Sequence, residues 1–318
     1  ADILMTPLAN ALAAQGHHIG RFKTTADFRA QPDALRKSDV IVTLDVIDRA
    51  ILRQAPNLRA LVSPATGTEH LDEAAATELG VLVVNGQIPE NSFSMSEAAA
   101  LFILAALYDL NGAQDLLCRP AGDTRRPHRP RMLMGKTVGL IGFGQIAQGL
   151  ALRLSTWGVS MLAAVRTPRP LPDYVRAAPL ETLLVESDVV VVLTPFTDET
   201  RGMLSPERLA LMKEDAVFVN VARGGIADDD ALAALAKARP NMRVALDVFS
   251  PEPLRINSPL RDLPNAILTP HAIGNTAELF SRLPVAMLEN IQRLLKGELP
   301  DCIRNPAIID SWLRRWRS

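Results

Sequence analysis

A glycine-rich turn between an apolar strand and a helix constrains the fold of this chain more than any other feature. The stretch VGLIGFGQIAQGL, residues 138–150, has the spacing Gly-x-Gly-x-x-Ala at Gly142, Gly144 and Ala147. The first glycine permits a tight turn, the second lets a phosphate approach the backbone, and the alanine keeps the helix close to the strand. The free N–H groups of the following helix N-terminus also favour phosphate. The spacing therefore predicts a β-α-β unit that binds a dinucleotide.

Apolar runs alternate with helical patterns after this turn. The runs are rich in Val, Leu and Ile, as expected for strands buried on both faces of a parallel sheet. We expect these strands at 137–142, 160–165, 188–195, 216–222, 242–249 and 266–271. Helices are expected at 145–158 with Gly158 as its stop, at 205–212 and at 228–238. This alternation is typical of a doubly wound α/β domain.

The first part of the chain repeats the alternation. Strands are expected at 1–6, 17–22, 39–44, 58–64 and 81–86. An Ala- and Leu-rich helix at 95–110 is apolar nearly all round, which indicates burial between domains or at a subunit contact. The amphipathic helix at 283–300 follows the second sheet, and we expect it to pack on the first domain.

Composition limits the classes of protein that this chain can represent. Its 318 residues favour two domains. Its net charge of −1 gives no excess of positive charge that would favour binding to nucleic acid or to an anionic membrane surface. No apolar run reaches the roughly 18 residues that span a bilayer, and the start lacks a signal peptide's basic region. The two cysteines form neither a disulfide framework nor a metal-ligand spacing. We therefore expect a cytoplasmic protein with no metal, nucleic-acid or membrane partner.

The segment CRPAGDTRRPHRPRMLMG, residues 118–135, is rich in Pro and Arg. Such a sequence cannot form a helix or a central strand. We interpret its core, residues 119–131, as a solvated connector rather than a binding patch.

Several polar or charged residues stand where the predicted strands of the second series end. Ligands of open α/β sheets sit outside the carboxyl ends of the strands. These polar or charged residues are Thr194, Arg223, Asp247, Glu252 and His271, and Pro195 and Ala222 stand beside them at the same strand ends. Each has an ordinary alternative, because Arg223 can cap a helix, Glu252 can be a solvated loop acid and His271 can be structural. Because all of these residues follow a turn that predicts dinucleotide binding, we favour a shared functional site.

Arg223, Glu252 and His271 suit hydride transfer to a carbonyl group. Hydride transfer builds negative charge on the oxygen, and a histidine can deliver a proton there near neutral pH. A carboxylate can hold the ring of that histidine, and an arginine can bind a substrate carboxylate and polarise the carbonyl. These three residues therefore predict an NAD(P)-dependent oxidoreductase.

The second strand after the glycine turn bears on the choice of dinucleotide. An NAD site usually carries an acid about 20 residues on. Residues 162–170 contain no acid and instead contain Arg166, Thr167 and Arg169. Because a guanidinium can pair with a 2′-phosphate that an acid would repel, we favour NADP(H) over NAD(H). The alternative is an arginine that covers the adenine while NAD binds.

The chain resembles the D-isomer-specific 2-hydroxyacid dehydrogenase family over nearly its whole length, and at Arg166 it is most similar to glyoxylate and hydroxypyruvate reductases. The matching stretches are 65–85, 94–107, 135–151, 193–225, 246–254 and 268–276. The resemblance implies a Rossmann dinucleotide-binding domain (97–284) inserted in a flavodoxin-like substrate domain (1–96 and 285–318). Both are expected to be doubly wound parallel-sheet domains.

The resemblance also implies site roles and a homodimer. His271 and Glu252 would form the acid/base pair, and Arg223 would bind the 2-keto or 2-hydroxy acid. The backbone amides of Thr66, Gly67 and Thr68 would bind its carboxylate. The expected cofactor contacts are Gly142, Gly144, Gln145, Ile146, Arg166, Thr167, Thr194, Pro195, Ala222 and Asp247.

Two alternatives remain open. Formate and phosphite dehydrogenases share much of this pattern. A non-enzymatic, dinucleotide-sensing binding protein of the corepressor type would keep the same three polar residues.

Overall fold

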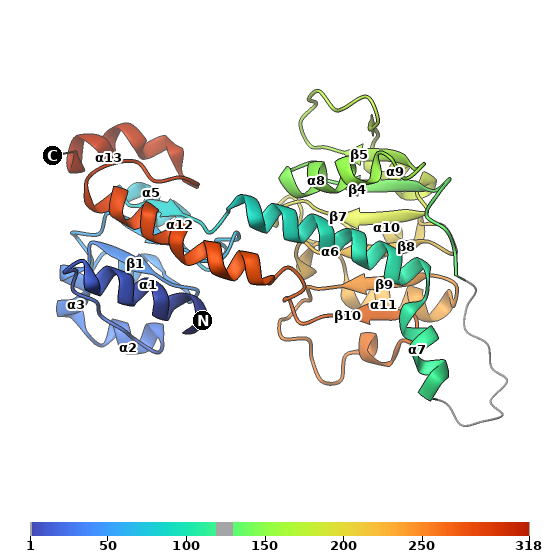
Figure 1. Ribbon diagram of the computed structural model, residues 1–318, viewed down its shortest axis with the longest axis horizontal. Helices are drawn as coiled ribbons and strands as arrows, with labels where there is room; N and C mark the ends of the chain where they lie inside the picture. The colour runs from blue at the N-terminus through green and yellow to red at the C-terminus, as the bar shows by residue number, and fades with distance from the viewer. Residues whose placement is uncertain (1, 119–129, 318) are drawn as a thin grey trace. The chain divides into compact units, whose positions relative to one another are not determined.

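A computed structural model describes residues 2–118 and 130–317 and contains two compact units (Figure 1). Unit 1 comprises residues 1–91 and 276–318, and unit 2 comprises residues 92–275. Each unit is built on a parallel sheet with helices on both faces, so the predicted α/β fold class is confirmed.

Unit 2 contains a seven-stranded parallel sheet in the order β10-β9-β8-β7-β4-β5-β6. Its strands are β4 (Thr137–Ile141), β5 (Ser160–Ala164), β6 (Arg176–Ala177), β7 (Val189–Val192), β8 (Val217–Asn220), β9 (Arg243–Leu246) and β10 (Ala266–Leu268). The six expected strands are confirmed, and β6 is an additional short edge strand. The chain runs outward from β4 to β6 and then crosses back to β7, so the order reverses between β4 and β7. Ligands bind outside the carboxyl ends of strands at such a reversal.

Helices cover both faces of this sheet. The helices of unit 2 are α6 (Pro89–Leu107), α7 (Leu110–Cys118), α8 (Gln145–Leu154), α9 (Leu180–Glu186), α10 (Pro206–Ala210) and α11 (Asp229–Ala238), with 3₁₀ turns η1 (Gly224–Ile226) and η2 (Pro259–Asp262). Helix α7 buries none of its residues and takes no part in this cover. Val189 and Val191 of β7 pack with α6, which crosses one face in Figure 1, and with α8. Val190 and Val192 pack with α9, α10 and α11 on the other face. This alternation explains why the strands are apolar at every position.

Two details of the expected helices differ in the structure. Helix α8 ends at Leu154, and Gly158 lies beyond it in a turn with φ of +68°. Helix α6 is not buried on all sides, because Phe93 and Leu101 are 56% and 54% exposed. In the described chain, no single helix is long and apolar enough to cross a membrane; α6 and α7 reach that length and composition only together, across a bend of 55°.

Unit 1 contains a three-stranded parallel sheet in the order β1-β2-β3, with β1 (Val40–Val42), β2 (Ala60–Val62) and β3 (Leu82–Val84). One face packs on α2 (Thr25–Arg29), α3 (Pro32–Lys37), α4 (Arg49–Leu52) and α5 (Glu73–Glu78). The other face packs on α1 (Asp2–Ala14), α12 (Ala277–Leu295), η3 (Pro306–Ile308) and α13 (Ile309–Trp316). Helices α1 and α12 lie side by side (Figure 1). The expectation that the late amphipathic helix packs on the first domain is therefore confirmed.

The strands predicted at 1–6 and 17–22 are wrong. Residues 2–14 form α1, whose buried Leu8 and Leu12 stand one helical turn apart. A six-residue apolar run cannot by itself separate a strand from a helix, and here the deciding spacing lies beyond the run. Residues 17–22 form neither a helix nor a strand. Ile19 and Phe22 of this segment instead pack against two different cores of unit 1.

Most of the Pro- and Arg-rich segment, residues 119–129, lies outside the described residues. We expected Arg131, at the end of this segment, to be solvated, but it is largely buried. The Arg131 side chain is only 15% exposed and forms an ion pair of 2.8 Å with Asp215.

Candidate active site

The glycine turn follows β4 directly and sits at the reversal of strand order. Gly142 has φ of +92°, and a Cβ there would stand 2.9 Å from the carbonyl oxygen of Leu193, so a side chain is excluded on two grounds. Gly144 is the N-cap of α8, and a Cβ there would meet no atom within 4 Å. Ala147 is fully buried against the sheet. The turn thus leaves open space beside a helix N-terminus, which fits the pyrophosphate of a dinucleotide.

The two residues after the turn begin α8. Gln145 is its first residue, and its Oε1 accepts a hydrogen bond of 3.2 Å from Ser92 Oγ. Ile146 follows and is partly exposed. Both therefore stand at the helix end where phosphate is expected.

Arg166 and Thr167 follow β5 and are exposed. The Arg166 guanidinium forms an ion pair of 2.9 Å with Glu199, a residue of the loop after β7. Arg169 donates a hydrogen bond to the carbonyl of Phe143 inside the glycine turn, and its guanidinium lies 5.8 Å from the centre of the Phe143 ring. One arginine is therefore attached to the turn itself, and the other is paired with a carboxylate.

Thr194, Pro195 and Ala222 follow β7 and β8. The Cα of Thr194 is one of the atoms that a Cβ on Gly142 would strike. The Pro195 carbonyl accepts a hydrogen bond of 2.8 Å from Thr200 Oγ1. The Ala222 amide donates a hydrogen bond of 3.0 Å to Asn220 Oδ1. Thr194 therefore stands directly against the glycine turn.

Glu252 and His271 are in direct contact. His271 Nδ1 lies 2.7 Å from Glu252 Oε2. The His271 side chain is 44% exposed and the Glu252 side chain is 35% exposed. The second oxygen of Glu252, Oε1, accepts a hydrogen bond of 3.0 Å from the Phe249 amide. The carboxylate is thus held from both sides. Because Nδ1 is engaged, Nε2 is the ring nitrogen of His271 that can exchange a proton with a substrate.

Asp247 holds the turn that carries His271. Its side chain is buried, and its Oδ1 accepts hydrogen bonds from Thr269 Oγ1 at 2.6 Å, from the Ala272 amide at 3.0 Å and from the Ile273 amide at 3.2 Å. His271 lies between these partners in a left-handed conformation, with φ of +53°. The sequence placed Asp247 at a strand end but did not reveal this supporting role.

Ser94 of α6 is a second support that the sequence did not reveal. Its hydroxyl donates a hydrogen bond of 2.7 Å to the carbonyl of Gly274, three residues after His271. No sequence motif marks this contact, since the two residues are 180 positions apart.

Arg223 stands three residues after the end of β8, in an extended conformation with φ of −148°. The next residue, Gly224, packs so tightly that a Cβ there would lie 1.9 Å from the carbonyl carbon of Phe249. Arg223 Nη1 donates a hydrogen bond of 2.7 Å to the Ala222 carbonyl. Since β8, β9 and β10 are neighbours in the sheet, Arg223, Glu252 and His271 follow three adjacent strands.

Thr66, Gly67 and Thr68 lie in unit 1, in the loop after β2. The Thr66 hydroxyl donates a hydrogen bond of 3.1 Å to Asn91 Oδ1, and the Thr68 hydroxyl donates one to Glu73. Asn85 Nδ2 donates a hydrogen bond of 2.6 Å to the Thr66 carbonyl. Among the described residues, none accepts a hydrogen bond from the backbone N–H groups of these three residues.

Within residues 2–118 and 130–317, no group of three or more His, Cys, Asp or Glu residues could hold a metal ion.

Comparison with known proteins identifies the family. Residues 101–272, more than half of the chain, match the model for the D-isomer specific 2-hydroxyacid dehydrogenase NAD binding domain. A glyoxylate reductase of Thermofilum pendens is 32% identical over 291 residues, which are 86% of this chain and 84% of that protein. The TT0316 protein of Thermus thermophilus has a similar structure, with a TM-score of 0.81, 29% identity and coverage of 94% and 96% of the two chains.

A D-lactate dehydrogenase of Aquifex aeolicus, solved with NAD and lactic acid, has a TM-score of 0.74 and 25% identity over 88% of this chain and 87% of that one. The chain belongs to the D-isomer specific 2-hydroxyacid dehydrogenase family.

Proposed function

We propose that this chain reduces a small 2-keto acid of the glyoxylate or hydroxypyruvate type and uses NADPH for the reaction. As a D-2-hydroxyacid dehydrogenase, the protein moves a hydride between a nicotinamide cofactor and a 2-keto/2-hydroxy acid pair. The observation that carries the proposal is the contact of 2.7 Å between Glu252 and His271, both partly exposed at the carboxyl edge of the sheet that holds the glycine turn.

The residues of unit 2 would handle the proton and the charge of the reaction. A bound nicotinamide supplies or accepts the hydride. His271 would deliver a proton from Nε2 to the carbonyl oxygen, and Glu252 would hold the ring in place and stabilise its protonated form. Arg223 would bind the substrate and stabilise the negative charge that develops on the carbonyl oxygen.

We further propose which unit holds which ligand. Unit 2 would be the dinucleotide-binding domain, because it contains the glycine turn and the reversal of strand order. Asp247 and Ala222 would contact the nicotinamide end of the cofactor. Unit 1 would be the substrate domain, with the backbone N–H groups of Thr66, Gly67 and Thr68 receiving the substrate carboxylate. The absence of a protein acceptor for these groups within the described chain supports this assignment.

A panel of substrates tests the function. Glyoxylate, hydroxypyruvate, pyruvate and larger 2-keto acids would be reduced with NADPH and with NADH, and formate would be tested in the oxidative direction. We expect the highest kcat/KM with glyoxylate or hydroxypyruvate. Binding of dinucleotide without turnover of any of these compounds would contradict the proposal and favour a dinucleotide-sensing binding protein.

The preference for NADPH rests on the arginines beside the glycine turn. Residues 162–170 offer no carboxylate to a ribose 2′-hydroxyl, whereas Arg166 and Arg169 offer two guanidinium groups to a 2′-phosphate. The ion pair of Arg166 with Glu199 is exposed on both sides, so it costs little to exchange Glu199 for a phosphate.

Replacement of Arg166 by Ala should raise the KM for NADPH by about 10- to 100-fold, because a hydrogen bond to a charged group contributes on the order of 1.5–3 kcal/mol. The KM for NADH should change little. Steady-state kinetics with both cofactors provide the measurement. Arg176→Ala is the matched control, since this arginine is also exposed and ion-paired in the same unit. An unchanged KM for NADPH, or a parent protein that prefers NADH, would remove Arg166 from cofactor selection.

We also propose that the protein is a cytoplasmic homodimer. Several large apolar side chains are exposed in and around α6 and α7, and burial of such side chains against a second copy would favour a dimer. These are Phe93, Leu101, Leu110, Leu117, Met132 and Met134. Sedimentation equilibrium would support the dimer at twice the chain mass of 34.5 kDa.

A further inference from the structure

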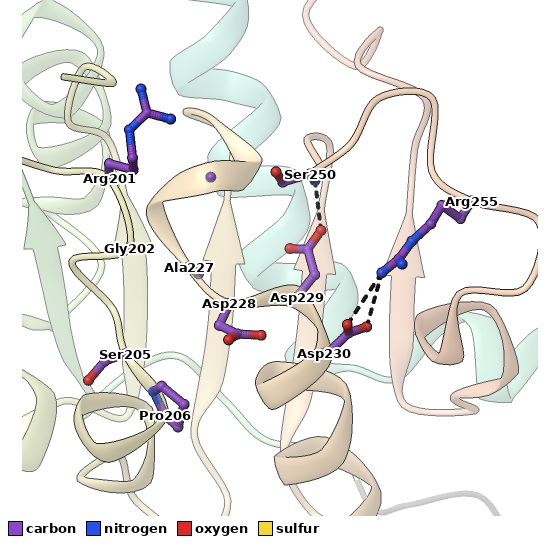
Figure 2. Close-up of a pocket in the computed structure, with 11 residues that line it drawn as sticks. Arg201, Gly202, Ser205, Pro206, Ala227, Asp228, Asp229, Asp230, Ser250 and Arg255 are labelled. Atoms are coloured by element: carbon purple, nitrogen blue, oxygen red, sulfur yellow. Dashed lines mark hydrogen bonds and ion pairs between the residues drawn. The ribbon is translucent and has the colours of Figure 1, made fainter. Parts of the chain in front are cut away.

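The loop that carries Glu252 is attached to helix α11 at two points. The Asp229 Oδ2 atom accepts a hydrogen bond of 2.8 Å from the Ser250 amide (Figure 2). One residue further along α11, Asp230 forms an ion pair of 3.3 Å with Arg255. These contacts stand on either side of Glu252 in the sequence, so the first turn of α11 holds both ends of its loop.

The contact of Asp229 leads directly to the Glu252–His271 pair. Asp229 binds the amide of Ser250, and Glu252 Oε1 binds the amide of the preceding residue, Phe249, at 3.0 Å. Glu252 Oε2 then lies 2.7 Å from His271 Nδ1. Two consecutive backbone amides therefore connect the Asp229 carboxylate to the Glu252 carboxylate.

Asp229 is not needed to begin α11. The N-cap is Asp228, whose side chain accepts a hydrogen bond from the Ala231 amide. Asp229 is instead 9% exposed, and burial raises its pKa to about 6, with a further contribution from Asp230 and Asp228. A buried carboxylate beside two other acids is costly, and its hydrogen bond with Ser250 offsets part of that cost.

We propose that Asp229 is a positioning residue, which places the Glu252 carboxylate against His271 by holding the backbone of Ser250. This inference rests on the roles proposed above for Glu252 and His271. Asp229 does not touch substrate or cofactor in this proposal, and it acts through the loop alone.

The environment of Asp229 makes this support sensitive to pH. Asp229 lines a cavity of about 350 Å³, through which its carboxylate can exchange protons with water (Figure 2). The charged groups around it are Asp228 and Asp230 on its own helix, Arg255 on the loop and Arg201 across the cavity. An ionised carboxylate accepts a hydrogen bond more strongly than its neutral form. As the pH falls through about 6, protonation of Asp229 weakens its bond to Ser250.

The test compares Asp229→Ala, Asp229→Asn and the control Asp33→Asn in the full chain. The measurements are kcat and KM for glyoxylate and hydroxypyruvate with NADPH from about pH 5 to 8, and thermal unfolding. Asp229→Ala should lower kcat by about 100-fold, the cost of a misplacement of about 1 Å in an active site, with an unchanged KM for NADPH. Asp33→Asn should remain close to the parent, because Asp33 is an exposed acid in the first turn of α3 and pairs with Arg36 of the same helix.

Asp229→Asn separates positioning from stability, because its amide oxygen can accept the same N–H at every pH. It should retain most of the parent kcat near neutral pH and lose the parent's decline in kcat as the pH falls through about 6. The pH profile of Asp229→Asn therefore tests the positioning role of Asp229 even if Asp229→Ala does not fold. A kcat of Asp229→Ala close to that of the parent, or an Asp229→Asn profile identical to the parent's, would overturn the proposal.

His271→Gln in the same assay distinguishes the two possible failures. If His271→Gln is inactive while Asp229→Ala is normal, only the positioning role is wrong. If His271→Gln is normal, the proposed function itself fails.

Discussion

Replacement of His271 by Gln should lower kcat for 2-keto acid reduction by about 10²- to 10⁴-fold, the factor that general acid catalysis supplies. The glutamine amide can still contact Glu252, but it cannot release a proton to a carbonyl oxygen. The dissociation constant for NADPH, measured by fluorescence titration, should change little. The reason is that Asp247 and Ser94, not the His271 side chain, hold the surrounding turn.

The backbone at His271 requires a second variant as a control. His271 has φ of +53°, a region that costs most side chains about 1–2 kcal/mol but that Asn enters more readily. His271→Asn should therefore be as inactive as His271→Gln while unfolding closer to the temperature of the parent. His18→Gln, at an exposed position of unit 1, should leave kcat unchanged. Near-parent turnover in both His271 variants would exclude His271 as the proton donor.

The sheet of unit 2 was predictable because each of its central strands is buried on both faces. Val189–Val192 has no polar position at all, and such a run has few alternatives once glycine turns and helix caps bound it. In unit 1 the same reasoning failed at 1–6, where residues 2–6 belong to α1. Periodicity needs more than six residues to separate a period of two from a period of 3.6.

The residues at the strand ends could be located from the sequence, but the hydrogen bonds that hold their loops in place could not. Arg223, Glu252 and His271 each follow an apolar run, so a parallel sheet brings them to one edge. The contacts of Asp247 with Ala272 and of Asp229 with Ser250 join residues 25 and 21 positions apart. Such contacts depend on how two loops fold against each other, which no spacing of residue types records.

The same limit applies to the cofactor. The sequence shows that residues 162–170 contain Arg166 and no acid, but it does not show that Glu199 stands 2.9 Å from that arginine. Glu199 reaches Arg166 only because β7 crosses back beside β4, which pairs with β5 on its other side. The expected preference for NADPH thus depends on whether a 2′-phosphate can displace Glu199 from Arg166, and only the three-dimensional fold reveals that Glu199 is there.

Replacement of Arg223 by Gln should lower kcat/KM for glyoxylate or hydroxypyruvate by about 10²- to 10³-fold, as for removal of one group that stabilises a developing oxyanion. The tight contact of Gly224 with Phe249 holds the Arg223 backbone close to the Glu252 loop, so the variant should keep the same main-chain position. Arg223→Lys should recover only part of the loss, because an ammonium keeps the charge but not the planar pair of donors.

The division of the Arg223 effect between kcat and KM reports what the side chain does. A loss confined to KM would mean that Arg223 binds the substrate carboxylate equally in the ground state and the transition state. An equal fall in kcat and kcat/KM would mean that it acts on the carbonyl oxygen as charge develops there. Arg208→Gln is the matched control, since Arg208 pairs with Glu181 away from the strand ends. If Arg223→Gln and Arg223→Lys both retained the parent's kcat/KM, Arg223 would have no role in the reaction, and the Glu252–His271 pair alone would have to account for substrate activation.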